Sequence, residues 1–385
     1  MNQLAVPNLA VPPSHTAQEI AQQPALWRQV DTSPATESAR AFAQELLTGP
    51  PPRVVLTGAG TSGYVGQIVA AELARSWGSR VDAVASTDIV ATPRDAFVED
   101  VPTLLVSFAR SGDSPESVAA TTLADQCLTA VHHLVITCNS DGELARQHRG
   151  RPRSQVLILP DGSNDQGFAM TSSFTSMAVA ALAAVYRHRP TELGEQLAGA
   201  AELLLREIPE KAREVMSQRP RRVVYLGSGA LAGLARESAL KVLELTAGRI
   251  NAMGETPLAF RHGPKAVLTD HTLVVLYLSN DPHTRAYDQD LLAELRASKA
   301  GHQVLAITAD HQDLLKGAPT WILPTATRFP DSLLAVPAVI CAQLLGLHAS
   351  LGLGLNVDNP FPAGEVNRVV NGVTIYPLPP SAEQT

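Results

Sequence analysis

Cysteine is scarce in this chain of 385 residues, which contains three: Cys127, Cys138 and Cys341. Three scattered cysteines are too few for a disulfide framework or a tetrahedral zinc site. Basic residues are also in deficit, because 30 Lys+Arg face 37 Asp+Glu and the formal net charge is −7. A protein with a net negative charge repels polyanions such as nucleic acids, so we expect no nucleic-acid partner. We expect a cytoplasmic protein that uses no metal and no other cofactor.

Signals for export or membrane insertion are equally weak. The first 13 residues lack a basic segment followed by a sustained apolar core, so they do not resemble a signal peptide. The uncharged stretch 337–355 is long enough to raise the question of a membrane span. Because polar residues such as Gln343 and His348 interrupt it, we interpret it as a buried closing helix and expect no membrane association.

Two glycine-rich turns of near-identical design stand half a chain apart, each after a β-branched run and before a helical pattern. The first spans residues 58–63 (Gly-Ala-Gly-Thr-Ser-Gly) and the second 227–233 (Gly-Ser-Gly-Ala-Leu-Ala-Gly). Gly229 follows Gly60 by 169 positions, which is the length of one α/β domain and too long for a solenoid repeat. The chain is therefore predicted to contain an internal duplication.

The rest of the pattern alternates short β-rich runs with helical stretches, which predicts an α/β fold of parallel strands covered by helices on both faces. We expect two doubly wound sheets, as in flavodoxin-like αβα sandwiches, preceded by a helical arm. A possible capping box, Thr16 with Glu19, opens the first helix of that arm. The predicted units are an arm (1–52), a first domain (53–190), a second domain (200–355) and a C-terminal tail over the active site (356–385). The predicted strands are 54–57, 81–84, 103–107, 133–137, 155–159, 223–226, 273–277, 304–307 and 321–323.

Ligands of such sheets bind beyond the carboxyl ends of the strands, where three loops of the first domain are rich in small hydroxyl residues. Glycine N–H groups, hydroxyls and a helix N-terminus together suit a monophosphate. Each serine taken alone can equally be a helix cap or a turn residue. The glycine loop also fits the dinucleotide fingerprint, and the acidic candidates do not settle the question. Asp82 opens rather than ends the second predicted strand, and Asp88 stands 25 residues past Gly63, later than the usual ribose-binding position. The candidate contacts are Gly60, Thr61, Ser62, Arg110, Ser111, Ser114, Thr171 and Ser172.

The second domain has lost the serine cluster at residues 277–282, so phosphate binding is expected in the first domain alone. It carries instead a helix with Glu237, Lys241 and Glu244 on one narrow stripe between leucines. An ordinary surface ion pair at spacing i,i+4 would explain two of the three. His262 follows on an irregular loop, and histidine can both donate and accept protons at neutral pH.

These residues carry a resemblance to tandem sugar isomerase (SIS) domain proteins. It is narrowed by residues 367–375 to the tagatose-6-phosphate ketose/aldose isomerase family, whose members are also assigned as galactosamine-6-phosphate deaminases. The resemblance runs from about residue 16 to 378 and rests on five motifs, at residues 57–62, 107–117, 237–248, 260–265 and 367–375.

The resemblance implies that Ser62, Ser111 and Ser114 bind a sugar phosphate and that Glu244 moves a proton between C1 and C2. It also implies that His262 opens the sugar ring, reaching across from the partner subunit of a homo-oligomer. Lys241 is a further catalytic candidate, and Glu237 and Asn371 are candidate substrate contacts. Two departures are notable. Ala109 replaces a phosphate-binding serine of the related synthases, and Asn371 replaces their lysine, which puts a sugar-imine route in doubt.

The expected reaction converts galactosamine 6-phosphate to tagatose 6-phosphate and ammonia by proton transfer through an enolamine. Alternatives are aldose–ketose isomerisation without deamination, the same deamination of glucosamine 6-phosphate, and a non-catalytic sugar-phosphate sensor. A sensor would not need Glu244 with His262.

Overall fold

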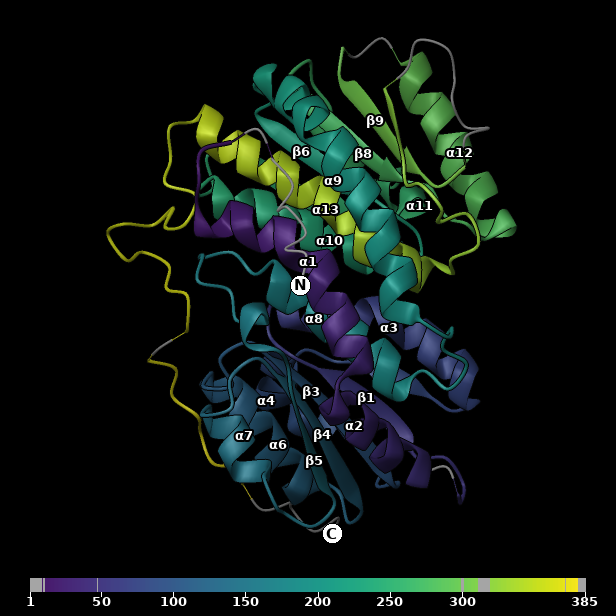
Figure 1. Cartoon of the computed structure of the whole chain (residues 1–385), viewed down its shortest axis with the longest axis vertical. Helices are drawn as coiled ribbons and strands as arrows, with labels where there is room; N and C mark the ends of the chain where they lie inside the picture. Colours follow the sequence, from purple (N-terminus) through teal and green to yellow (C-terminus); the bar gives the residue numbers. More distant parts are fainter. Residues whose placement is uncertain are drawn as a thin grey trace, which may run out of the picture.

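Two parallel sheets of five strands form the two lobes of the protein, one above the other in Figure 1. The computed structural model describes residues 9, 11–46, 48–298, 301–310, 319–370 and 372–379. The first sheet has the strand order β2-β1-β3-β4-β5 and the second has β7-β6-β8-β9-β10, with every pair parallel. Both sheets therefore have the same topology, and the predicted α/β fold with two doubly wound sheets is confirmed.

Buried apolar runs build the first sheet. On β1, Val54 and Leu56 pack into the large central core, whereas Val55 packs on the opposite face with Leu105 and Ala120. A strand buried on both faces reads as a continuous hydrophobic run, which is why these strands could be found from sequence. The strands are β1 (Arg53–Thr57), β2 (Val81–Ala83), β3 (Thr103–Ala109), β4 (Val131–Thr137) and β5 (Ser154–Ile158). The helices are α3 (Thr61–Trp77), α4 (Ser86–Ala91), α5 (Pro93–Ala96), α6 (Pro115–Cys127), α7 (Glu143–His148) and α8 (Ser172–Val185), with a 3₁₀ turn at Asp161–Ser163.

The second sheet contains one strand that we did not predict, β7 (Asn251–Glu255). Its five residues include no β-branched side chain, so propensity gives no signal there. Gly254 of this strand lies so close to α10 that an added Cβ would be 2.5 Å from the Ala235 carbonyl oxygen. The other strands are β6 (Arg222–Leu226), β8 (Thr272–Tyr277), β9 (Gln303–Thr308) and β10 (Thr320–Ile322). The helices are α10 (Ala230–Leu245), α11 (Pro257–Phe260), α12 (Pro282–Ala297) and α13 (Asp331–Gly352), with a 3₁₀ turn at Pro264–Val267.

The duplication extends to individual backbone angles. Gly60 has φ 53° and ψ −126°, and Gly229 has φ 55° and ψ −123°, a conformation that residues with a Cβ rarely adopt. The preceding glycines also match, because a Cβ on Gly58 or Gly227 would lie within 2.8 Å of the residue four positions later. Both glycine-rich turns are therefore built the same way, and each starts a helix.

Long helices join the lobes. α9 (Leu193–Ser217) occupies the stretch between the two sheets and packs against α1 and α13 (Figure 1). Within the described residues, α13 is the one helix that is long and apolar enough to cross a membrane. Its apolar stretch is entirely buried inside the protein. It forms the predicted closing helix of the core.

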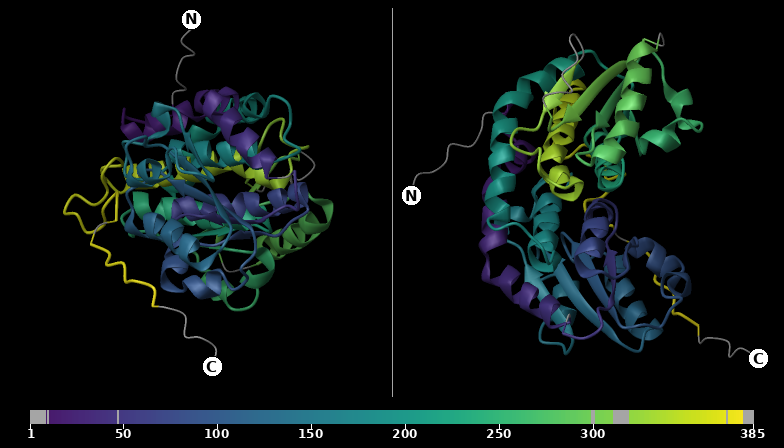
Figure 2. Two further views of the ribbon diagram at one scale, coloured as in Figure 1. Left: turned by 90° about the horizontal axis from the view of Figure 1, so that it is seen from below. Right: turned by 90° about the vertical axis from the view of Figure 1, so that its right-hand side faces the viewer.

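The N-terminal arm consists of α1 (His15–Thr32) and α2 (Pro34–Glu45), and it packs against α8 and α9. The right-hand view of Figure 2 shows it lying along α9 on one side of the molecule. Trp27 is fully buried and its indole N–H donates to Thr175 Oγ1 at 3.0 Å. The predicted capping box is wrong, because Ser14 caps α1 by accepting from the Ala17 N–H. The Glu19 carboxylate turns inward instead and accepts from the Gly167 N–H.

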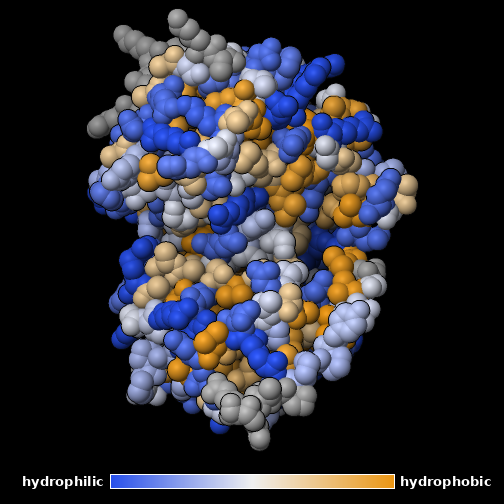
Figure 3. Space-filling model, turned by 180° about the vertical axis from the view of Figure 1, so that it is seen from behind, coloured by the Kyte–Doolittle hydropathy of each residue, from blue (hydrophilic) through white to orange (hydrophobic). Residues whose placement is uncertain are grey.

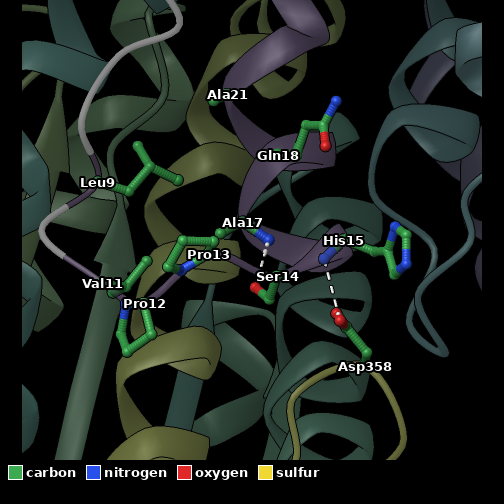
Figure 4. Close-up of a pocket in the computed structure, with 10 residues that line it drawn as sticks. All are labelled: Leu9, Val11, Pro12, Pro13, Ser14, His15, Ala17, Gln18, Ala21 and Asp358. Carbon is green, nitrogen blue, oxygen red and sulfur yellow. Dashed lines mark hydrogen bonds between the residues drawn. The ribbon is translucent and has the colours of Figure 1, made fainter.

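The tail beyond α13 returns to the start of α1. Asp358 accepts hydrogen bonds from the His15 N–H, the Thr16 N–H and the Thr16 hydroxyl. Figure 4 shows this junction beside a cavity of about 480 Å³ lined mainly by Leu9, Val11 and the first turns of α1.

The face of the molecule that points away from the viewer in Figure 1 is drawn in Figure 3. It mixes hydrophobic and hydrophilic residues and is hollowed between the two lobes.

Candidate functional site

The site is assembled where α10 of the second lobe packs across α3 of the first. Close contact is possible because Gly233 faces α3, where an added Cβ would lie 3.0 Å from side-chain atoms of Gln67 and Ile68. Arg236 donates to Gln67 Oε1 at 2.8 Å on the same interface. The polar stripe of α10 is thereby turned toward the glycine-rich loop of the first lobe.

Lys241 lies at the centre of this stripe and is completely buried. Its ammonium nitrogen is 2.6 Å from Glu244 Oε2, 3.3 Å from Glu237 Oε1 and 3.0 Å from Thr61 Oγ1. A lysine has three N–H donors, and each has an oxygen within reach here. These residues are therefore more than a surface ion pair, because the buried cation also bonds the first turn of α3 in the other lobe.

The two carboxylates of this cluster differ in environment. Glu237 is fully buried, and burial raises its pKa to about 7, although Lys241 acts against the shift. Burial lowers the pKa of Lys241, but attraction to Glu237 and Glu244 outweighs it and the net direction is upward. Glu244 keeps 24% of its side chain exposed. One ammonium thus faces two carboxylates. Glu237 is closed off from solvent, and Glu244 is the one open to a substrate.

Two serines of the loop after β3 have hydroxyls available to a ligand. Ser114 occupies the N-cap position of α6, yet its hydroxyl makes no capping hydrogen bond. Ser111 Oγ accepts from the Asp113 N–H at 3.2 Å and keeps its own O–H free to donate. Ser62, in the first turn of α3, is almost fully buried. These positions fit hydroxyl donors at two helix N-termini better than ordinary caps.

Arg110 is buried beside this loop and makes two hydrogen bonds to backbone carbonyls. It donates to the Phe168 oxygen at 3.1 Å and to the Arg368 oxygen in the tail at 2.8 Å. Burial and the nearby Arg368 lower the pKa of its guanidinium, while Asp165 and Glu244 raise it. The cation therefore lies within electrostatic reach of Glu244, and no ion pair satisfies it among the residues that the structure describes.

Thr171 and Ser172 use their hydroxyl groups inside the protein rather than at a surface open to a substrate. Both are completely buried, and the Thr171 hydroxyl donates to Asp165 Oδ1 while the Ser172 hydroxyl donates to the Glu19 carbonyl. Asp165 also accepts from the backbone N–H groups of Thr171, Ser172 and Ser173. The sequence analysis missed Asp165, whose signal is an acidic residue six positions before a run of hydroxyl residues.

His262 lies apart from this cluster. It is exposed on the loop after α11, and no hydrogen bond or ion pair joins its side chain to another described residue. Its neighbour Arg261 pairs with Asp290 and Glu294, so the chain on one side of the loop is held to α12. Asn371 lies outside the described residues.

Tyr64 also belongs to the site but was missed by sequence analysis. It stands one turn after Thr61 on α3, and both burial and the charge of Glu237 raise the pKa of its phenol. Its signal was the helical spacing from Thr61. Thr57 and Ser107, which pair across the ends of β1 and β3, have buried hydroxyls without a protein partner.

The second lobe fills the corresponding loops with its own carboxylates. Asp331 accepts from the Ser279 hydroxyl at 2.5 Å and from the Asn280 N–H at 2.8 Å. Asp288 accepts from the Ser228 hydroxyl at 2.6 Å and from the Ser279 N–H at 3.0 Å. The donors that could meet a phosphate are thus already bonded to the chain, in agreement with the loss of the serine cluster.

A family model described as SIS domain matches the chain twice, at residues 47–187 and 216–351. The chain belongs to the SIS domain family. The predicted resemblance to tandem SIS proteins is thereby confirmed, and the dinucleotide alternative is set aside. The two matched segments contain the two sheets described above.

Individual SIS relatives match nearly the whole chain. A Streptomyces coelicolor protein provisionally named D-galactosamine-6-phosphate deaminase AgaS is 55% identical over 368 residues, covering 94% of this chain and 96% of the relative. The D-galactosamine-6-phosphate deaminase AgaS of Escherichia coli is 43% identical over 378 residues, covering 96% and 98%. The crystal structure of tagatose-6-phosphate ketose/aldose isomerase from Escherichia coli is 40% identical and superposes with a TM-score of 0.88, covering 96% and 98%.

Proposed function

We propose that the chain is a D-galactosamine-6-phosphate deaminase that forms tagatose 6-phosphate and ammonia. The observation that carries the proposal is the buried Lys241 held between Glu237, Glu244 and Thr61, together with the two available serine hydroxyls on the loop after β3. Support for the substrate comes from relatives of that name, which match this chain over nearly its full length.

In the proposed reaction, Ser62, Ser111 and Ser114 hold the phosphate at the helix N-termini, with Arg110 near by. Glu244 takes the proton from C2 of the open-chain aldehyde and returns it to C1, which gives first an enolamine and then an imine at C2. Water adds to C2, ammonia leaves and the ketose remains. A positioned general base of this kind contributes roughly 10²–10⁴-fold to a rate.

Lys241 fixes the orientation of Glu244, because the ammonium is held by three oxygens and cannot turn away. Glu237, with a pKa raised to about 7, limits the total negative charge around the C2 proton. We assign ring opening to His262 of a second copy in a homo-oligomer. Its exposure on the second lobe and the lack of a contact with Glu244 within the described chain support that assignment. We also propose a cytoplasmic location, which fits the three free cysteines.

The deciding experiment follows ammonia release from galactosamine 6-phosphate and, separately, from glucosamine 6-phosphate. Ammonia from the galacto epimer alone is expected. Equal release from both epimers would replace the substrate assignment, and no release from either would overturn deamination.

Aldose–ketose isomerisation of tagatose 6-phosphate is the second candidate, favoured by the TM-score of 0.88 to the isomerase from Escherichia coli. It needs the same proton transfer without the loss of ammonia. Incubating tagatose 6-phosphate with the protein in D₂O separates the two, because an isomerase yields an aldose labelled at C2 and a dedicated deaminase yields none.

A further inference from the structure

A second cavity, of about 790 Å³, lies at the amino-terminal edge of the second sheet. The C-terminal ends of α9 and α13 border it, together with the turn that follows α10 (Figure 1). It contains none of the residues assigned above to proton transfer or phosphate binding. Its lining has six basic residues and no aspartate or glutamate, and these are Arg213, Arg219, Arg221, Arg249, His271 and His348.

Three of these arginines lack a counter-ion. Arg213 pairs with Glu210 at 2.6 Å, but the side chains of Arg219, Arg221 and Arg249 make no ion pair or hydrogen bond with any described residue. Arg219, Arg221 and Arg249 are exposed around the same hollow, and like charges placed around one hollow repel each other. In a protein with a formal charge of −7, such a local excess of positive charge favours an anion.

His348 provides an independent observation. It lies in α13 with 6% of its surface exposed, and its Nε2 atom is buried with no hydrogen-bond partner among the described residues. A buried polar atom left unpaired is destabilising, so a polar group of a ligand that bonds it here removes that cost. The imidazole and the arginines line the same cavity.

The remaining wall of the cavity is apolar and includes Met216, Ile250 and Leu351. Ligand sites are typically about 300–1,000 Å³ and combine apolar walls with a few polar groups. The cavity therefore suits an organic anion with an apolar or planar body rather than a bare inorganic ion. A small ligand fits this concave shape better than an extended polyanion does.

We propose that this cavity is a second binding site, which takes an organic phosphate of nucleotide size. Its phosphate groups lie among Arg219, Arg221 and Arg249, and its body packs on Met216 and Ile250. Arginine guanidinium groups match phosphate oxygens because they can donate two parallel hydrogen bonds. Binding at this site is independent of the proposed deaminase activity.

Calorimetric titration of the full-length protein with ATP, AMP, adenosine and inorganic triphosphate tests the proposal. ATP is expected to bind at least tenfold more tightly than adenosine and than inorganic triphosphate. Adenosine lacks the phosphate groups that the arginines bind, and inorganic triphosphate lacks the nucleoside that packs on the apolar wall. The double variant Arg219→Gln/Arg249→Gln is expected to weaken ATP binding at least tenfold. Arg206→Gln, which removes an exposed arginine of α9 outside the cavity, is the matched control and should bind like the parent.

Two further measurements test where ATP binds and whether a second copy of the chain occupies the cavity. Ser114→Ala should leave ATP affinity unchanged, whereas a parallel loss would place ATP in the phosphate loop of the first lobe and overturn the proposal. Sedimentation of Arg249→Gln tests whether the basic cavity instead receives an acidic segment of a second copy. A changed oligomeric state with unchanged ATP binding overturns the small-molecule site, as does the absence of ATP binding in the parent. Circular dichroism and thermal unfolding confirm that the variants are folded.

Discussion

Lys241 Nζ lies 3.0 Å from Thr61 Oγ1, so a buried ammonium of the second lobe is bonded to the first turn of a helix in the first lobe. The contact joins the proton-transfer cluster on α10 to the glycine loop on α3. One hydrogen bond therefore connects the proposed phosphate site with the proposed proton-transfer cluster.

Replacing Thr61 by valine keeps the shape of the side chain and removes the oxygen that Lys241 reaches. A hydrogen bond to a charged group contributes about 1.5–3 kcal/mol, so a loss of unfolding free energy of that order is expected, together with a lower kcat. Urea denaturation and ammonia-release kinetics measure the two effects. Thr122→Val, at an exposed site on α6, should change neither. Unchanged stability and kcat in Thr61→Val would remove the contact from the mechanism.

Replacing Glu244 by glutamine removes the proposed base while preserving its size. We expect kcat to fall at least about 100-fold with KM within a few-fold of the parent, because a general base acts in the transition state. The exchange of C2 hydrogen for solvent deuterium should fall in parallel. Glu207→Gln on α9, an exposed member of a 3.9 Å ion pair, is the matched control. Full activity in Glu244→Gln would assign proton transfer to another group.

Ser114 and Ser33 both stand at N-cap positions but differ in what their hydroxyls do. Ser33 Oγ accepts from the Thr36 N–H at 3.0 Å, whereas Ser114 caps nothing. Ser114→Ala should therefore raise KM by about tenfold or more with little change in stability. Ser33→Ala should cost about 1 kcal/mol of stability and leave KM unchanged. The opposite pattern would make Ser114 a structural cap.

His148 makes the stability of the first lobe sensitive to acid. Burial lowers the pKa of His148 to about 4, and the charges of His133 and Arg151 act in the same direction. The charge of Asp125 acts in the opposite direction and raises the pKa. Because the unfolded chain takes up this proton near pH 6.5, the contribution of His148 to stability is complete above that pH. It is lost as the pH falls through about 4, and the loss amounts to about 3 kcal/mol.

The variant His148→Gln tests this pH dependence. Its unfolding free energy should fall less than that of the parent between pH 7 and pH 4.5, as measured by urea denaturation at both values. His188→Gln, at an exposed position after α8, is the control. An identical loss in parent and His148→Gln would show that other groups carry the acid sensitivity.

The sequence was sufficient to predict the two sheets, because their strands are buried on both faces and their glycine turns repeat. It also indicated the Glu237, Lys241 and Glu244 stripe, since helical spacing places these residues on one face. Nothing in the sequence shows that Thr61 completes the shell of Lys241, because that contact spans 180 positions and depends on how two helices cross.

Other failures have equally specific causes. β7 was missed because it forms from pairing with β6 rather than from β-propensity. The capping box at Thr16 was wrong because both of its residues bond elsewhere. The Glu19 carboxylate accepts from the Gly167 N–H, and the Thr16 hydroxyl donates to Asp358 in the tail. Thr171 and Ser172 looked like ligand contacts, but a buried aspartate meets their N–H groups. Partners distant in sequence decided the outcome for β7 and for the capping box, whereas the partner of Thr171 and Ser172 lies six and seven positions away.

The carboxylates of Asp288 and Asp331 distinguish the second half of the duplication from the first. Both halves keep the same turn and the same strand order, yet in the second half the chain supplies its own anions where a phosphate could otherwise enter. A dianion arriving there would meet the carboxylates of Asp288 and Asp331, which already hold the Ser228 and Ser279 hydroxyls. We therefore expect the two halves to differ in function, with phosphosugar binding in the first half alone. The expected stoichiometry is one phosphosugar per chain, which an equilibrium titration counts directly.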